Sequence, residues 1–145
     1  MTERIQIKEI EPESWKAMMA LENYIQHTTV DPKLKELLKI RASHVNSCTY
    51  CIDMHTEYAL KLGETEKRIA ALAVWKESHL FSEAERIALQ LTDEITLISV
   101  QGVTNETYNN AVSCFGEKGT AQLIMLAVLI NSWNRIATTT KMIYK

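Results

Sequence analysis

The chain is predicted to fold as an all-α domain, and three features of the sequence indicate this. Glycine and proline are scarce, with four and two in 145 residues, so few points interrupt a helix. Apolar residues recur mainly at spacings of three and four, as on a helix with one buried face. Because 46% of the residues are hydrophobic, residues 1–145 can bury a core and are expected to form a single domain.

Six or seven helices are expected, each beginning near a capping residue or proline. The expected spans are 12–27, 32–45, 48–63, 65–76, 82–95, 104–116 and about 118–143. Pro12 and Pro32 suit the first turn of a helix, and Asp31 is a good N-cap. Asn46 and Ser47 are also capping residues, so a helix is expected to begin at Cys48.

The second half has equally clear boundaries. Ser82 and Glu85 have the spacing of a capping box, and Thr104 can cap the following helix. Gly116 is expected to end that helix. The last helix is apolar nearly all round in its centre, which indicates a surface shared between subunits of a homo-oligomer.

Charge and hydropathy exclude several classes of function. The net charge of −2 offers no general attraction to phosphate backbones or anionic lipid, so no nucleic-acid partner is expected. The first residues lack the basic and apolar blocks of a signal peptide, which favours a cytoplasmic protein. The longest apolar stretch, 123–130, is far shorter than the roughly 20 residues of a membrane-spanning helix, so no membrane role is expected.

The segment 48–55, CTYCIDMH, carries the most specific chemical signal. Residues three and four apart are neighbours on a helix, so Cys48 is expected to lie beside Cys51, and Cys51 beside His55. Unpaired amides and the helix dipole at a helix start stabilise a thiolate. Helix position therefore favours Cys48 as the more acidic thiol, whereas His55 favours Cys51.

Glu36 belongs to the preceding helix, and an antiparallel return would place its carboxylate beside His55. A carboxylate there would orient the imidazole and raise its basicity, which would complete a proton relay to Cys51.

Metal binding and inert thiols are the alternatives for this pair. A closed tetrahedral zinc site needs a fourth ligand, and the second cysteine pair or HxxxH of a structural zinc motif is missing, so no metal is expected. In a reducing compartment a close CxxC is instead typical of reversible redox chemistry.

The residues Glu36 and 43–55 resemble the core of the AhpD-like alkylhydroperoxidases of the carboxymuconolactone decarboxylase superfamily. The similarity continues in 80–86 and 129–135. The resemblance implies an all-helical, oligomeric protein, commonly a trimer or hexamer. It also implies a peroxidase that reduces hydroperoxides, is reset by an external dithiol such as a lipoyl group or a small redox protein, and holds no bound cofactor.

The resemblance also implies roles for individual residues. Cys51 would be the thiol oxidised by peroxide, Cys48 would close the redox disulfide with it, and Glu36 and His55 would relay protons. Two accessory candidates depart from the family pattern. Tyr50 stands where a histidine is common, and His44 where glutamine is common.

Two other functions compete with the peroxidase. One is an oligomeric redox sensor or redox-regulated binding protein without turnover, and the less favoured one is a decarboxylase or lactone-processing enzyme. Outside the motif, Cys114 is expected to be a small buried hydrophobe, because it lies among apolar residues. Trp133 and Tyr58 are expected to pack in the core or an interface, although they would also suit a pocket for an apolar peroxide.

Overall fold

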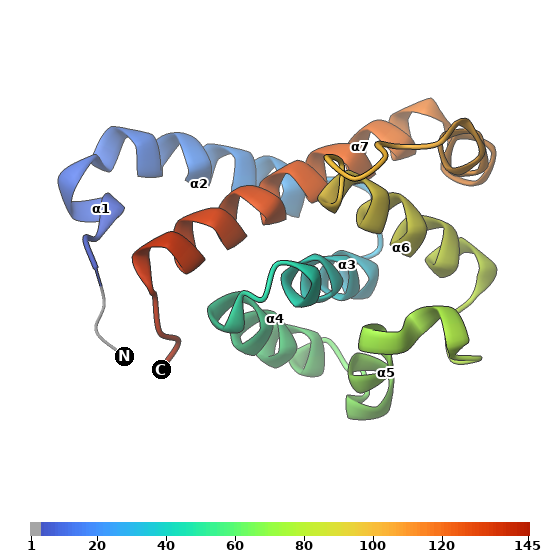
Figure 1. The fold of residues 1–145 in the computed structure, drawn as a ribbon, viewed down its shortest axis with the longest axis horizontal. Helices are drawn as coiled ribbons and strands as arrows, with labels where there is room; N and C mark the ends of the chain where they lie inside the picture. Colours follow the sequence, from blue (N-terminus) through green and yellow to red (C-terminus); the bar gives the residue numbers. More distant parts are fainter. Residues whose placement is uncertain (1–3) are drawn as a thin grey trace.

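A computed structural model describes residues 4–145 as a bundle of helices with no strand in that range (Figure 1). Residues 1–3, which belong to the segment considered for an export signal, lie outside the described residues. The elements are α1 Ile7–Ile10, α2 Pro12–Gln26, α3 Pro32–Val45, α4 Thr49–Lys61, α5 Glu66–Ala71, the 3₁₀ helix η1 Leu72–Glu77, α6 Glu83–Thr96 and α7 Asn105–Thr140. The all-α prediction is confirmed.

The expected capping residues define most boundaries. Asp31 accepts a hydrogen bond from the Leu34 amide at the start of α3, and Ser82 and Glu85 form the complete capping box of α6. Thr104 caps α7 through the Thr107 amide. These side chains satisfy amides that would otherwise lack partners in the first turn of each helix.

Several boundaries differ from the predictions. The short α1 was not predicted, and the span 65–76 divides into α5 and η1. The final helix ends at Thr140, because Lys141 adopts the left-handed conformation with φ of 58°. Gly116, with φ of 74°, breaks α7 as expected, and Figure 1 shows its two parts running in different directions.

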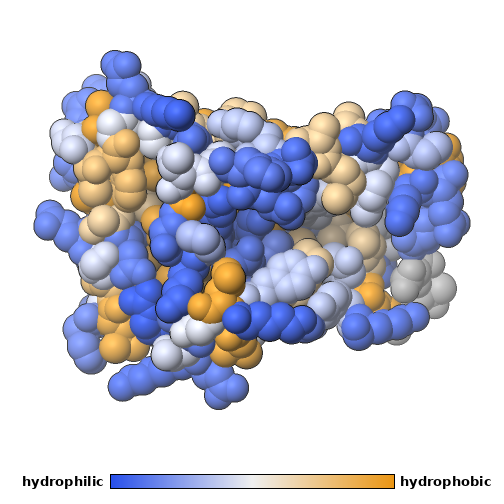
Figure 2. Space-filling view, turned by 180° about the vertical axis from the view of Figure 1, so that it is seen from behind, coloured by the Kyte–Doolittle hydropathy of each residue, from blue (hydrophilic) through white to orange (hydrophobic). Residues whose placement is uncertain are grey.

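The core lies between α3, α6 and the long second part of α7, with α2 above and α4 below in Figure 1. By length and composition alone α7 could cross a membrane. Buried core helices of soluble proteins often have the same length and composition. Several of its apolar side chains are fully buried against the other helices, among them Leu123, Leu126, Leu129 and Ile130. Figure 2 shows a largely polar face with small scattered apolar patches and a hollow near its middle.

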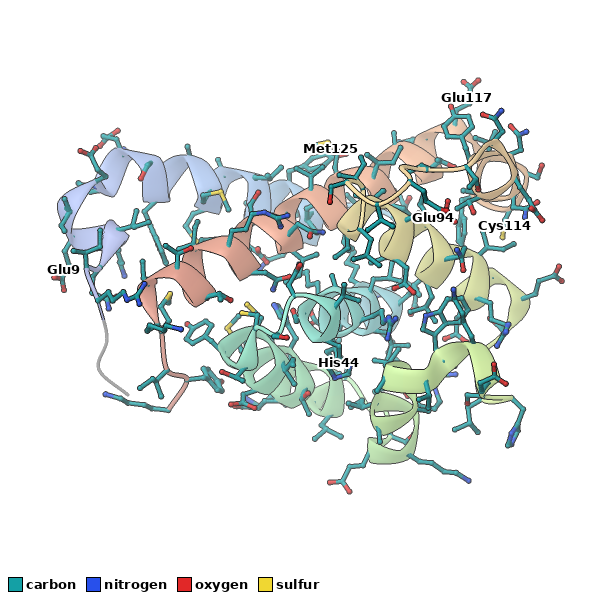
Figure 3. All side chains as sticks on the ribbon, in the orientation of Figure 1. Glu9, His44, Glu94, Cys114, Glu117 and Met125 are labelled. Carbon is teal, nitrogen blue, oxygen red and sulfur yellow. The ribbon has the colours of Figure 1, made fainter. Side chains whose placement is uncertain are left out.

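Cys114 contradicts its prediction. It is exposed, and Figure 3 places it at the far end of the molecule from the N-terminus of α4. The surrounding apolar residues belong to the short part of α7 before Gly116, where Cys114 is on the outer face.

A buried ion pair ties α3 to α6 and η1. Asp93 accepts hydrogen bonds from Arg41 Nε at 2.7 Å, Arg41 Nη2 at 3.1 Å and the Trp75 indole at 3.0 Å. Arg41 Nη1 also donates to the carbonyl oxygens of Leu72 and Ala73. The partners of Arg41 therefore come from two elements, α6 and η1, and the pair links α3 to both.

Replacing Asp93 with alanine should lower the free energy of unfolding by about 3 kcal/mol, because Arg41 and the Trp75 indole would lose their acceptor while remaining largely buried. Urea denaturation followed by circular dichroism measures the change. The exposed pair of Lys61 with Glu57 provides the control, and Lys61→Ala should change the free energy of unfolding far less than Asp93→Ala does. Equal losses in the two variants would contradict the structural role of Asp93.

Candidate functional site

The turn between α3 and α4 positions both cysteines. Ser47 takes a left-handed conformation with φ of 54°, and the Ser47 and Cys48 amides donate to the carbonyl oxygens of His44 and Ser43. These two hydrogen bonds form a Schellman motif, which ends α3 and reverses the chain. Cys48 is consequently the N-cap of α4 rather than a residue of its first turn.

This arrangement corrects the prediction that Asn46 or Ser47 caps the cysteine helix. Ser47 is needed for the reversal, because its backbone makes the left-handed step. The Asn46 amide nitrogen instead donates to the side-chain oxygens of Asn131 and Asn134 on α7, both at 2.9 Å. Asn46 therefore ties the turn to the core helix.

The two thiols are buried and unlinked. Cys48 is 2% exposed and Cys51 1% exposed, and both are free. Cys51 is the third residue of α4, so its backbone amide and its thiol both approach the Cys48 sulfur. The pair thus lies at the electropositive start of a helix.

Contact between the two thiols shifts their pKa values in opposite directions. The hydrogen bond from the Cys51 thiol is the largest cause that lowers the pKa of Cys48 to about 6, and the Cys51 backbone amide, Thr138 and Asn134 contribute further. The same contact, together with burial, raises the pKa of Cys51. A first proton is therefore lost easily from the pair and a second one with difficulty, so near neutral pH the two sulfurs share one negative charge.

Two buried polar residues, Asn134 and Ser43, lie beside the thiols. Asn134 interacts with both sulfurs, and Ser43 interacts with Cys51. The Asn134 amide nitrogen donates to Ser43 Oγ at 2.9 Å, and Ser43 Oγ donates to the Lys39 carbonyl at 2.7 Å. Since each of these groups has a fixed partner, the donors around the sulfurs are held in position before any reaction.

His55 lies one helical turn beyond Cys51 and is 3% exposed. Its Nδ1 is 2.7 Å from Glu36 Oε2, across the antiparallel pair of helices α3 and α4. A carboxylate accepts here, so Nδ1 carries the proton and Nε2 is the free acceptor of the neutral ring. The structure thus brings together Glu36, His55, Cys51 and Cys48.

A second carboxylate extends this network. Lys39 Nζ lies 3.9 Å from Glu36 Oε1 and 3.2 Å from Glu22 Oε1, and the Trp133 indole donates to Glu22 Oε2 at 3.0 Å. The cation of Lys39 therefore lies between two largely buried carboxylates. Lys39 thus offsets the negative charge that the two carboxylates bring into this part of the core.

A cavity of about 220 Å³ opens at Cys51, and we call it the Cys51 cavity. Its walls come from one face of α2, the first turns of α4 and the end of α7. Its lining residues are Trp15, Met19, Glu22, Gln26, Tyr50, Cys51, Met54, His55, Tyr58, Trp133, Ala137 and Met142. Trp133 and Tyr58 are thus pocket residues, and the aromatic and thioether side chains make the cavity mainly apolar.

A larger cavity of about 380 Å³ opens at Cys48, and we call it the Cys48 cavity. It is enclosed by the start of α4, the end of α7 and the C-terminal segment. Its lining residues are Ser47, Cys48, Thr49, Tyr50, Asp53, Ala137, Thr138, Lys141, Met142, Ile143 and Tyr144. Cys51 does not line this cavity and Cys48 does not line the other, so each thiol faces a different space.

The two accessory candidates have different positions. Tyr50 lines both cavities, and burial raises its pKa. His44 lines neither cavity, and Figure 3 shows it on the α5 side of α3. Burial and the nearby Arg41 lower the pKa of His44, so it is a neutral residue outside the cysteine site.

Sequence reasoning did not identify Glu22, Lys39, Ser43 and Asn134 as site residues. A signal for Asn134 was present in the sequence, because Asn131 and Asn134 follow the apolar stretch 123–130 at helical spacing. Polar residues on the same face as an apolar stretch are candidates for a buried polar site. Within the described residues, no group of three or more His, Cys, Asp or Glu side chains is arranged to hold a metal ion.

Comparison with known proteins identifies the family. Residues 12–94 match the model of the carboxymuconolactone decarboxylase family. The chain is 42% identical over 137 residues to the uncharacterized protein YdfG of Bacillus subtilis, covering 94% of this chain and 93% of that protein. It is 30% identical over 69 residues to the uncharacterized protein YnjA of Escherichia coli, covering 47% and 37% of the two chains.

Solved structures show the same fold. A protein of unknown function from Agrobacterium tumefaciens, proposed to be the antioxidant defence protein AhpD, superposes with a TM-score of 0.96 at 33% identity over 99% of both chains. The debrominase Bmp8 shares the fold, with a TM-score of 0.80 at 17% identity over 94% of this chain and 74% of that one. On the matched residues, the fold and the CxxC at the start of α4, the chain belongs to the carboxymuconolactone decarboxylase family as an AhpD-like member.

Proposed function

We propose that the protein is a thiol-dependent peroxidase that reduces hydroperoxides through Cys51 and Cys48. The observation that carries the proposal is the joint placement of Cys51 and the Glu36-bound His55 in one apolar cavity. A nucleophilic thiol, a proton acceptor and a space for an organic group are the parts that reduction of an organic hydroperoxide requires. Its similarity to a protein proposed to act in antioxidant defence supports this function.

The reaction begins with transfer of the Cys51 proton to His55 Nε2, which forms an imidazolium. The Cys51 thiolate attacks the terminal oxygen of the hydroperoxide, the O–O bond breaks, and the alkoxide leaves as an alcohol after it takes a proton from the imidazolium. Cys51 is then a sulfenic acid.

Disulfide formation completes the oxidative half of the reaction. The Cys48 thiolate attacks the Cys51 sulfur, the S–O bond breaks, and hydroxide leaves as water with a proton from solvent, which balances the proton that Cys48 released when it ionised. Its low pKa makes Cys48 ionised for this attack near neutral pH. An external dithiol then reduces the disulfide, and no bound cofactor takes part.

The Lys39 cation and the Trp133 indole support the relay indirectly. They hold Glu22 in the wall of the Cys51 cavity, and Lys39 also lies beside Glu36. We assign these residues positioning roles. Assembly into a homo-oligomer, with trimer and hexamer as the expected forms, would cover exposed apolar side chains such as Ile98, Val100 and Tyr108.

A redox sensor without turnover would use the same disulfide, so turnover separates the two functions. With excess dithiothreitol, a peroxidase consumes many equivalents of cumene hydroperoxide, whereas a sensor consumes one for each oxidation of its cysteine pair and shows no sustained rate.

Replacing Cys51 with serine should reduce steady-state consumption of cumene hydroperoxide at least about a hundredfold, because the attacking sulfur is lost. Replacing Cys48 with serine should leave a sulfenic acid on Cys51 that dimedone traps and mass spectrometry locates. The exposed Cys114 provides the matched control, and Cys114→Ser should retain the rate. Normal turnover in both Cys51→Ser and Cys48→Ser would refute the proposal.

The pH dependence of alkylation should show that Cys48 carries the negative charge of the cysteine pair near neutral pH. Below a pKa of about 6 Cys48 is protonated and unreactive, and above it Cys48 is a thiolate, so alkylation by iodoacetamide should rise with pH and level off near pH 7. Unfolded protein in urea should instead show a midpoint near the ordinary value of about 8.5. Peptide mass spectrometry should find the first adduct on Cys48, and identical midpoints in the folded and unfolded protein would contradict the assignment.

Replacing Glu36 with glutamine should slow peroxide turnover about tenfold to a hundredfold, because the imidazole loses the carboxylate that orients it and stabilises its protonated form. Alkylation of Cys48 by iodoacetamide should change little, since it needs a thiolate and no proton relay. The exposed Glu66 serves as the control, and Glu66→Gln should behave like the unmodified protein. Full turnover in Glu36→Gln would remove the relay from the mechanism.

A further inference from the structure

The two thiols of the pair face separate cavities, which suggests separate routes for two reactants. Tyr50, Ala137 and Met142 line both cavities and form the wall between them. Cys51 and His55 are on one side of this wall, and Cys48 is on the other. A molecule in the Cys48 cavity therefore meets Cys48 without passing through the apolar space beside His55.

The outer wall of the Cys48 cavity is the C-terminal segment 141–145. Lys141 ends α7 in a left-handed conformation, and the Met142 amide donates to the Ala137 carbonyl at 3.0 Å, so the chain turns toward the start of α4. Tyr144 Oη donates to Glu57 Oε2 at 2.6 Å. The Tyr144 ring packs edge-on against the Tyr50 ring, with 5.7 Å between the ring centroids.

This wall is held by exposed contacts. The Glu57 side chain is 45% exposed and also pairs with the exposed Lys61. Water competes for such hydrogen bonds, so the segment can move away from α4 at small cost compared with opening the core. Movement of this segment would uncover Cys48, which is otherwise 2% exposed.

We propose that the external dithiol enters through the Cys48 cavity and attacks Cys48, while the oxidising substrate meets Cys51 in the other cavity. This inference rests on the proposed function in one respect, which is that it requires the Cys48–Cys51 disulfide.

The exchange balances as two displacements. A thiolate of the reductant bonds to Cys48 Sγ, the Cys48–Cys51 bond breaks, and the electron pair passes to Cys51 Sγ, which takes a proton supplied by water through His55. The second thiol of the reductant then loses its proton to water and attacks the reductant's own bound sulfur. Cys48 leaves as a thiolate, and the reductant departs as a disulfide that has lost two electrons.

The environment of Cys48 favours the second displacement. Thr138 and Asn134 stabilise the Cys48 thiolate, and a stable thiolate is a good leaving group. The Cys51 sulfur, in contrast, is released next to His55, which can protonate it. Each sulfur is therefore placed for the role that the order of attack requires.

Mapping the site of attack tests the proposal directly. The disulfide is made with diamide, so that the test does not depend on peroxide as the substrate. The oxidised protein is mixed briefly with 2-mercaptoethanol, quenched in acid and alkylated, and fragment spectra of the peptide locate the adduct. We expect at least about tenfold more adduct on Cys48 than on Cys51, because Cys48 lines the larger cavity and attack there releases the Cys51 sulfur beside His55.

The outcomes separate this inference from the proposed function. Adduct mainly on Cys51 overturns the route through the Cys48 cavity and leaves the peroxidase proposal standing. Failure of diamide to link Cys48 to Cys51 overturns both.

Filling the Cys48 cavity with a larger side chain provides the second test. Thr138 is exposed, lines only the Cys48 cavity and is next to Thr139, which is also exposed and lines neither cavity. Thr138→Trp should slow reduction of the diamide-made disulfide by dithiothreitol at least about tenfold, because the indole occupies the route. Thr139→Trp should not slow it, and Thr138→Val, which removes the hydroxyl near Cys48 but leaves the space open, should slow it less than Thr138→Trp.

Reduction of Thr138→Trp at the rate of Thr139→Trp would overturn the proposal. If Thr138→Trp does not fold, as judged by circular dichroism, the adduct position in the unmodified protein decides.

Discussion

The reversal of the chain at residues 46–48 is the constraint on which the rest of the site depends. The left-handed step at Ser47 ends α3 and makes Cys48 the N-cap of α4. The same reversal lays α3 antiparallel to α4, so that Glu36 reaches His55. One local backbone conformation therefore places a thiol at a helix start and a carboxylate beside the base one turn further on.

Helix α7 supplies the surroundings that make this arrangement reactive. Its apolar residues fill the core, while Asn134 interacts with both sulfurs and Asn131 helps to hold the turn through Asn46. Burial alone would favour neutral thiols, whereas these donors and the contact between the thiols favour a single shared charge. The polar groups of a core helix thus tune the chemistry of the cysteine pair, and the wall formed at Ala137 separates the spaces on its two sides.

Much of the fold could be predicted from local signals. Caps at Asp31, Ser82 and Thr104 and the break at Gly116 act through nearby backbone groups, so sequence spacing reveals them. Spacing also indicated the closeness of Cys48, Cys51 and His55. The role of Ser47 was missed because nonglycine residues rarely take the left-handed conformation, and Cys114 was misplaced because apolar neighbours do not determine which face a helix buries. Glu22 and Lys39 meet across two helices, and such tertiary contacts leave no local pattern.

Oxidation of the protein by a single equivalent of cumene hydroperoxide shows whether Cys48 and Cys51 act as one redox pair. Mass spectrometry of the protein, quenched and alkylated after the reaction, reads the state of all three cysteines. We expect a disulfide between Cys48 and Cys51, with Cys114 alkylated and therefore still free before alkylation. Unmodified Cys48 and Cys51, or oxidation confined to the exposed Cys114, would contradict it.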